Sequence, residues 1–130
     1  MTYRSIGICL SILVAAHAHM AYAASKVPIA GYHCMMLNQS PDQMRDPNSV
    51  VYYRTKPEPN APTKGIVETV VAVQDGTSPT NGFVPALTFN RAEAWAPVQS
   101  LAPYRSASAS NTTCEPAIRA DGKLDFIFKH

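Results

Sequence analysis

Apolar and polar residues alternate along much of this chain, and that period of two is typical of β-strands. The strongest run covers residues 66–73 and carries apolar side chains on both faces, with Val67, Val71 and Val73 on one of them. A strand that is apolar on both faces is expected to pack on both sides, as in a small barrel. Further β-branched or aromatic runs predict strands at 50–53, 83–89 and 94–98.

Turn-forming pairs separate these runs. Asp75-Gly76 and Asn81-Gly82 predict turns in the connection that follows the strongest strand. Near the C-terminus, Asp121-Gly122 lies between two runs with strand patterns, 114–118 and 123–128. Two such runs joined by a short Asp-Gly turn predict a β-hairpin at the end of the chain.

Prolines leave little room for helices. The chain contains 11 of them, so few windows could hold a long helix. Residues 56–64 include three prolines and predict an extended loop, and the small polar segment 106–113 predicts a flexible connection. One helical turn is expected at 40–44, with Ser40 as the cap and Pro41 at the first position. Short strands with Pro- and Gly-rich turns favour an all-β sandwich or barrel, most economically one of about five strands.

The first 23 residues have the three parts of a secretory signal peptide. Arg4 gives a positive start, residues 6–16 form an uncharged apolar run, and Ala21-Tyr22-Ala23 fits the small-x-small cleavage pattern. An apolar run of about eleven residues is too short to span a bilayer, which needs roughly 20. We therefore expect cleavage after Ala23, no membrane span, and a periplasmic or secreted location.

Export changes how the cysteines are interpreted. Of the three cysteines, Cys9 lies within the signal peptide, which leaves Cys34 and Cys114 in the processed chain. An oxidising compartment favours a disulfide between them, which would close a loop of about 80 residues and strengthen a small domain. The alternative is a pair of redox-active free thiols, but there is no Cys-x-x-Cys spacing to lower a thiol pKa.

Charge and motif content exclude several classes of function. Without Arg4, ten Lys and Arg oppose nine Asp and Glu, and there is no basic stripe of the kind that nucleic-acid binders carry. His33 and His130 are the only histidines after residue 23, and no Gly-x-Ser-x-Gly motif is present. We therefore expect no catalytic residues, no cofactor and no nucleic-acid partner.

One local cluster suggests a metal. His33-Cys34-Met35-Met36 combines an imidazole with soft sulfur ligands, which suit monovalent copper. If Met35, Met36 and Met44 converged on His33, a copper-handling role would follow. The alternative is that Cys34 forms the disulfide and the methionines fill the core. We favour this alternative and expect no metal site.

Six consecutive segments between residues 48 and 104 form a distinctive series. They are a short strand, a proline-rich loop, a long Val-rich strand, a strand after a turn, a strand with a tryptophan, and a Leu-x-Pro-Tyr-like tail. In this sequence they are Val50–Arg54, Lys56–Pro62, Gly65–Val73, Gly82–Val84, Glu93–Ala96 and Leu101–Tyr104. The series resembles the bacterial SH3-like (SH3b-type) domains of exported proteins, although Ala94 stands where those domains usually carry glycine before the tryptophan.

The resemblance implies an organisation and a role. It implies a small SH3-like barrel of about five strands at 48–104, preceded by an N-terminal extension at 24–47 and followed by the linker and C-terminal hairpin at 105–130. It also implies a non-catalytic role, with ligands drawn from cell-wall peptides or envelope proteins.

Aromatic residues and the proline-rich loop form the candidate ligand surface, because aromatic side chains pair an apolar face with a polar tip. Of Tyr52 and Tyr53, the one that faces outward is the better candidate, since the other would fill the core. The expected ligand-binding residues are Tyr52, Tyr53, Arg54, Pro57, Pro59, Trp95 and Tyr104.

Two main hypotheses follow from this surface. The first is an exported binding module of the bacterial envelope that recognises cell-wall peptide or an envelope protein. The second is a secreted inhibitor or accessory subunit that covers a partner's site with the proline-rich loop. The first would sediment with the cell wall, whereas the second would form a one-to-one complex with a single protein.

Overall fold

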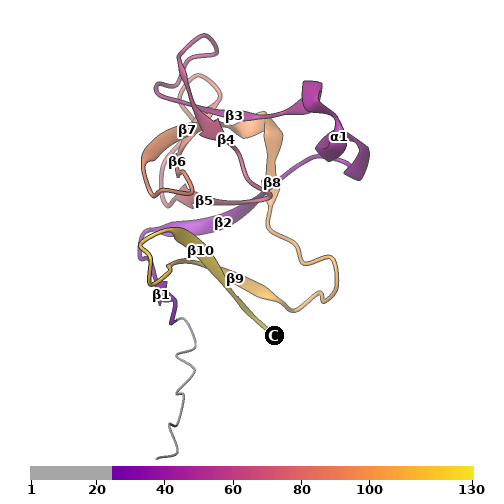
Figure 1. Cartoon of the computed structure of the whole chain (residues 1–130), viewed down its shortest axis with the longest axis vertical. Coiled ribbons are helices and arrows are strands. Elements are labelled where there is room, and N and C mark those ends of the chain that lie inside the picture. Colours follow the sequence, from indigo (N-terminus) through magenta and orange to yellow (C-terminus); the bar gives the residue numbers. More distant parts are fainter. Residues whose placement is uncertain (1–24) are drawn as a thin grey trace, which may run out of the picture.

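The computed structural model describes residues 25–130, so the expected signal peptide at 1–23 lies outside the described residues (Figure 1). Within this part of the chain, no helix is long and apolar enough to cross a membrane. The helical segments are α1 (Pro41–Arg45) and two 3₁₀ turns, Pro47–Ser49 and Val98–Ser100. The strands are β1 (Val27–Pro28), β2 (Tyr32–Leu37), β3 (Tyr52–Arg54), β4 (Thr63–Ile66), β5 (Val70–Gln74), β6 (Phe83–Leu87), β7 (Glu93–Pro97), β8 (Leu101–Pro103), β9 (Thr113–Ile118) and β10 (Leu124–Lys129).

The strands form two antiparallel sheets, which confirms the expected all-β class. One sheet has seven strands in the order β4-β3-β7-β6-β5-β2-β8, and the other has three in the order β1-β9-β10. The large sheet has more strands than the expected five, and it is not a closed barrel because β4 and β8 remain as its edges. One added strand is β2, which comes from the segment 24–47 and pairs with both β5 and β8.

The two sheets share β5 as a central packing element. Its residues Val71 and Val73 are buried in the main core, together with Tyr53 and residues of β6 and β7. The intervening Ala72 points to the opposite face, where it is buried with Leu87 and with Leu124 of the small sheet. Since successive side chains of a strand alternate between faces, the two-sided apolar pattern of this segment is satisfied by two separate clusters.

The expected single strand at 66–73 is wrong, because the chain changes pairing partner in its middle. Residues up to Ile66 belong to β4 and pair with β3, whereas those from Val70 belong to β5 and pair with β2. At the corner, the Val67 N–H donates to the carbonyl oxygen of Val51 at 2.9 Å, and the Thr69 carbonyl accepts from the Leu37 N–H at 2.9 Å. Two different strands therefore provide the hydrogen-bond partners of the backbone at the corner. The apolar pattern of the sequence runs through residues 66–73 without interruption, but the chain forms two strands there.

The C-terminal hairpin is confirmed as β9 and β10, and its tip packs against the turn between β6 and β7. The Leu124 N–H donates to the Phe89 carbonyl at 2.9 Å, and the Arg91 Nε donates to the Gly122 carbonyl at 2.7 Å. The Arg119 guanidinium also lies 5.3 Å from the centre of the Phe89 ring, a cation–π contact. These contacts fix the tip of the small sheet on the large one.

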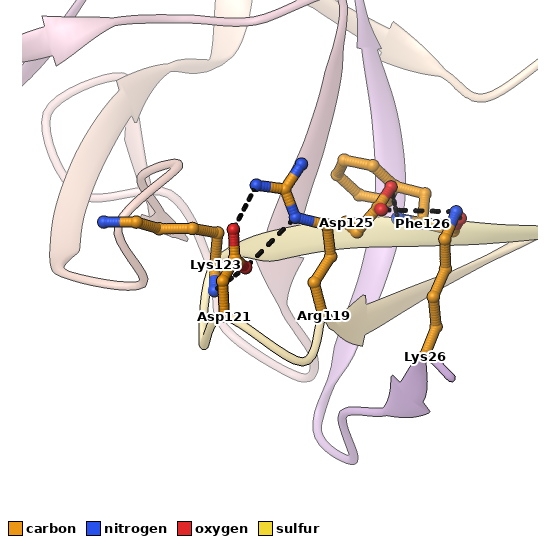
Figure 2. A network of polar contacts seen from close by, with 6 residues as sticks. All are labelled: Lys26, Arg119, Asp121, Lys123, Asp125 and Phe126. Carbon is orange, nitrogen blue, oxygen red and sulfur yellow. Dashed lines mark hydrogen bonds and ion pairs between the residues drawn. The ribbon is translucent and has the colours of Figure 1, made fainter. Parts of the chain in front are cut away.

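Polar side chains hold the hairpin turn itself, as Figure 2 shows. The Arg119 guanidinium donates to both carboxylate oxygens of Asp121, at 3.1 and 2.6 Å, and the Lys123 N–H donates to the same carboxylate at 3.0 Å. These contacts lower the pKa of the Asp121 carboxyl. Along the strand, the Lys26 ammonium lies 3.2 Å from the Asp125 carboxylate and donates to the Phe126 carbonyl at 3.0 Å.

Two further expectations are confirmed. A disulfide joins Cys34 of β2 to Cys114 of β9, so it links the two sheets across a sequence separation of 80 residues. Ser40 caps α1: its hydroxyl accepts from the Gln43 N–H, and the Gln43 side chain accepts from the Ser40 N–H. This reciprocal pair is a capping box.

Candidate functional site

Strand β3 decides which tyrosine is available to a ligand. Tyr53 is fully buried in the main core, whereas Tyr52 is 40% exposed. Arg54, two residues after Tyr52, lies on the same outer face because side chains of a strand alternate. The exposed tyrosine is therefore Tyr52, and the structure places Tyr53 among the core residues.

Tyr52 and Arg54 line a groove of about 260 Å³ on the outer face of the large sheet, here called the Tyr52 groove. Pro59 from the proline-rich loop forms part of its wall, and Phe83, Pro97 and Gln99 also line it. A second depression of about 250 Å³ shares four residues with it and extends it toward the turn at Asn81-Gly82. The four shared residues are Pro59, Phe83, Pro97 and Gln99.

The proline-rich loop between β3 and β4 is fixed by hydrogen bonds to its backbone. The Arg54 guanidinium donates to the Ala61 carbonyl at 3.1 Å, and the Asn81 side-chain amide donates to the Pro57 carbonyl at 3.2 Å. The Thr55 N–H donates to the Pro62 carbonyl at 3.0 Å and closes the base of the loop. A loop held at both its base and its middle presents Pro59 to the groove at little entropic cost.

The groove has a positive electrostatic character. Arg54 is the one charged residue among those that line it. A guanidinium has five N–H donors, and one N–H group of Arg54 bonds the loop, which leaves donors for a ligand. A planar guanidinium beside a tyrosine and two prolines is suited to a carboxylate attached to an apolar or extended chain.

Tyr53 supports the site from beneath the sheet. Its hydroxyl donates to the Glu68 carboxylate at 2.8 Å. Burial raises the pKa of the Tyr53 hydroxyl far above its ordinary value, and the negative charge of Glu68 raises that pKa further. The hydroxyl therefore stays protonated and serves as a fixed hydrogen-bond donor, which makes Tyr53 a packing residue behind the groove.

Two of the expected ligand residues lie elsewhere. Trp95 is half-buried on β7 and lines a different hollow, together with Tyr32 and Pro85. Tyr104 stacks on Phe128 at a ring distance of 5.8 Å, so it connects the end of β8 to β10. The structure thus brings together Tyr52, Arg54 and Pro59 in one groove and separates them from Trp95 and Tyr104, and Pro57 is not among the residues that line the groove.

Sequence reasoning missed Phe83, Pro97 and Gln99 as groove residues. A signal for the first two was present in the strand alternation, because Phe83 and Pro85 lie on the face opposite to Val84 and Ala86, which belong to the main core. The same alternation places Pro97 on the outer face of β7, directly opposite Phe83 in the strand register. Gln99 lies in a 3₁₀ turn after β7 and has no comparable pattern.

The sulfur-rich cluster does not converge on His33. Cys34 is used in the disulfide, Met35 packs against the main core, and Met44 lies on α1 with 46% exposure. The His33 imidazole pairs with the Asp75 carboxylate at 2.7 Å. Among residues 25–130, no group of three or more His, Cys, Asp and Glu side chains could hold a metal ion.

Comparisons with known proteins give no further guide to this site. No family model matches the chain, and neither the search of curated proteins nor that of solved structures found a match.

Proposed function

We propose that this chain is an exported, non-catalytic binding module of the bacterial envelope, built on an SH3-like fold. Its ligand is an extended peptide segment that carries a carboxylate, from the peptide part of the cell wall or from an envelope protein. The observation that carries the proposal is the Tyr52 groove, where an exposed tyrosine, one guanidinium and two prolines line a single concave surface.

The chemistry of the groove supports a peptide ligand. Tyr52 and Pro59 offer flat apolar surface, and Gln99 can both donate and accept hydrogen bonds to a peptide backbone. Arg54 adds one positive charge, which would pair with a carboxylate of the ligand. Because the loop that carries Pro59 is already fixed, binding would cost little ordering entropy.

The location of the protein is part of the proposal. The secretory pattern of residues 1–23 and the Cys34–Cys114 disulfide both favour the periplasm or the exterior of the cell. In the periplasm the protein would meet cell-wall peptides, whose free carboxylates would match the charge of Arg54.

The proline-rich loop between β3 and β4 favours a second candidate function, that of an inhibitor or accessory subunit. Glu58, Pro59 and Asn60 are exposed at its tip, and hydrogen bonds hold its base and middle. A preorganised exposed loop is what an inhibitor or accessory subunit would insert into a partner's site. In that case the partner would be a single protein bound with one-to-one stoichiometry.

Co-sedimentation with purified cell-wall sacculi tests the first candidate. The oxidised protein is expected to pellet with sacculi, and Tyr52→Ala is expected to lower the bound fraction at least fivefold. Phe89→Ala is the matched control, because Phe89 is similarly exposed, at 44%, but lies against Arg119 rather than in the groove.

The outcomes separate the candidates. Equal pelleting of the wild-type protein and Tyr52→Ala would remove the groove as the binding surface. If the wild-type protein stays in the supernatant, the wall is not the ligand. The same protein would then serve as bait in envelope extract, where a single partner lost on Glu58→Ala and Asn60→Ala substitution would favour the inhibitor.

A further inference from the structure

A second hollow lies on the outer face of the large sheet, and it shares no lining residue with the Tyr52 groove. Its volume is about 500 Å³. Strand register places four of its residues in one row across the sheet: Tyr32 pairs with Gln74, and Pro85 pairs with Trp95. The neighbouring pair Val73 and Ala86 brings Gln74 next to Pro85.

The row has an aromatic ring at each end. Adjacent strands lie about 4.8 Å apart, so three spacings separate the backbones of Tyr32 and Trp95 by roughly 14 Å. Gln74 and Pro85 form the floor between the two rings. A platform of this length would contact more than one ring of a ligand.

Polar side chains surround the aromatic residues. Thr55, Lys64 and Glu93 line the hollow together with Gln74, and all four are exposed. The Lys64 ammonium donates to the Glu93 carbonyl at 2.7 Å, so it is fixed at the rim. The positive charge of Lys64 balances the negative charge of Glu93, and the hollow therefore suits a ligand without net charge.

The backbone argues against a peptide in this hollow. Strands β5, β6 and β7 are interior strands of the sheet, each paired on both sides. Their N–H and C=O groups are therefore directed to neighbouring strands, and a peptide could not add to the sheet here. Recognition must rely on ring faces and on side-chain hydrogen bonds.

We propose that this hollow binds a neutral oligosaccharide of β-linked hexopyranose rings. Each such ring has an apolar face of C–H groups, which would stack on the rings of Trp95 and Tyr32. Its edge carries hydroxyl groups, which would bond the Gln74 amide, the Thr55 hydroxyl and the Glu93 carboxylate. The inference does not depend on the peptide ligand proposed for the Tyr52 groove.

Trp95 gives a direct test, because it is the one tryptophan in the 130 residues. The purified oxidised protein would be titrated with a tetramer of β-1,4-linked N-acetylglucosamine while the tryptophan emission is recorded. We expect a saturable change in the emission of Trp95. Gln74→Ala should weaken the affinity at least fivefold, whereas Tyr52→Ala in the other groove should leave it unchanged.

Binding by Trp95→Ala would be followed by heteronuclear NMR, which also shows whether the variant remains folded. A folded Trp95→Ala is expected to lose affinity at least tenfold. The proposal is overturned if neither this tetramer nor a β-1,4-linked glucose tetramer changes the emission or the amide shifts of the hollow. It is also overturned if Gln74→Ala and folded Trp95→Ala bind as tightly as the wild-type protein, or if a neutral peptide and not a saccharide saturates the signal.

Discussion

Replacing both Cys34 and Cys114 with alanine is expected to lower the free energy of unfolding by about 4–5 kcal/mol. The disulfide joins β2 to β9 and therefore connects the two sheets, across 80 residues of sequence. In the chain-entropy treatment, a cross-link that closes a loop of this length restricts the unfolded chain by about 4–5 kcal/mol. A domain of this size has a total stability of only about 5–15 kcal/mol, so the loss would be a large fraction of it.

The same free energy can be expressed as a melting temperature. For a domain of about one hundred residues, each kcal/mol corresponds to about 4–8 °C near the transition, so the double variant should melt about 16–40 °C lower. Circular dichroism during heating gives this temperature, and urea unfolding at 25 °C gives the free energy. Reduction of the wild-type protein should reproduce the double variant, whereas reductant should not affect the double variant itself.

A small shift in melting temperature would mean that the cross-link is not needed to hold the two sheets together. If the double variant melted within about 5 °C of the oxidised wild-type protein, the hairpin contacts around Phe89 and Leu124 would suffice to hold the two sheets together. The disulfide would then have little role in the stability of the domain.

The remaining predictions concern the two cores. Tyr53→Phe removes the hydroxyl that bonds Glu68 at 2.8 Å, and it should lower the free energy of unfolding by about 1–3 kcal/mol. The control Tyr52→Phe should change this free energy by less than about 0.5 kcal/mol. Urea titration measures both values. Burial raises the pKa of Tyr53 in the folded state, so its contribution is complete below about pH 10, where unfolded tyrosine titrates, and is lost as the pH rises further. The wild-type protein should therefore lose more stability between pH 9 and about pH 11 than Tyr53→Phe does; an equal loss would contradict the assignment. Leu124→Ala should cost about 2–5 kcal/mol and increase amide exchange in β9 and β10 before it does so in β6 and β7; uniform exchange would mean that the sheets unfold as one unit.

Local patterns were sufficient to predict several elements. Asp121-Gly122 between two alternating runs predicted the hairpin, and Ser40-Pro41 predicted the start of α1. These features depend on residues close in sequence, such as a turn that needs positive φ or a cap that bonds the third residue after it. The single possible pairing of Cys34 with Cys114 followed in the same way from their number and from the expected compartment.

Features that depend on strand partners could not be predicted. The apolar run at 66–73 is continuous, yet the chain turns at Val67 and Thr69 because β3 and β2 bind successive parts of it. Strand β2 was not predicted: Cys34 was assigned to the disulfide and the methionines to the core, but no strand pattern was recognised in this segment. Periodicity identifies the faces of a strand but contains no information on which strand lies beside it.

In the candidate site too, some features followed from the local sequence and others depended on the order of the strands. Tyr52, Arg54 and Pro59 were identified from residue type, and the structure brings them together. Sequence reasoning left open which tyrosine is exposed, since the run at 50–53 is apolar or aromatic on both faces. Trp95 and Tyr104 were grouped with them because they are aromatic, although strand order places both outside the Tyr52 groove.

Site-specific photo-crosslinking in cells can show whether the Tyr52 groove is the surface that meets the ligand. A benzoylphenylalanine residue would replace Gln99 in the Tyr52 groove and, in a separate variant, Phe89 at the exposed turn between β6 and β7. After irradiation of the cells that make the protein, we expect a covalent adduct from position 99, whether with wall peptide or with an envelope protein, and none from position 89. No adduct from position 99, or the same adduct from both positions, would contradict the claim that the Tyr52 groove is the binding surface.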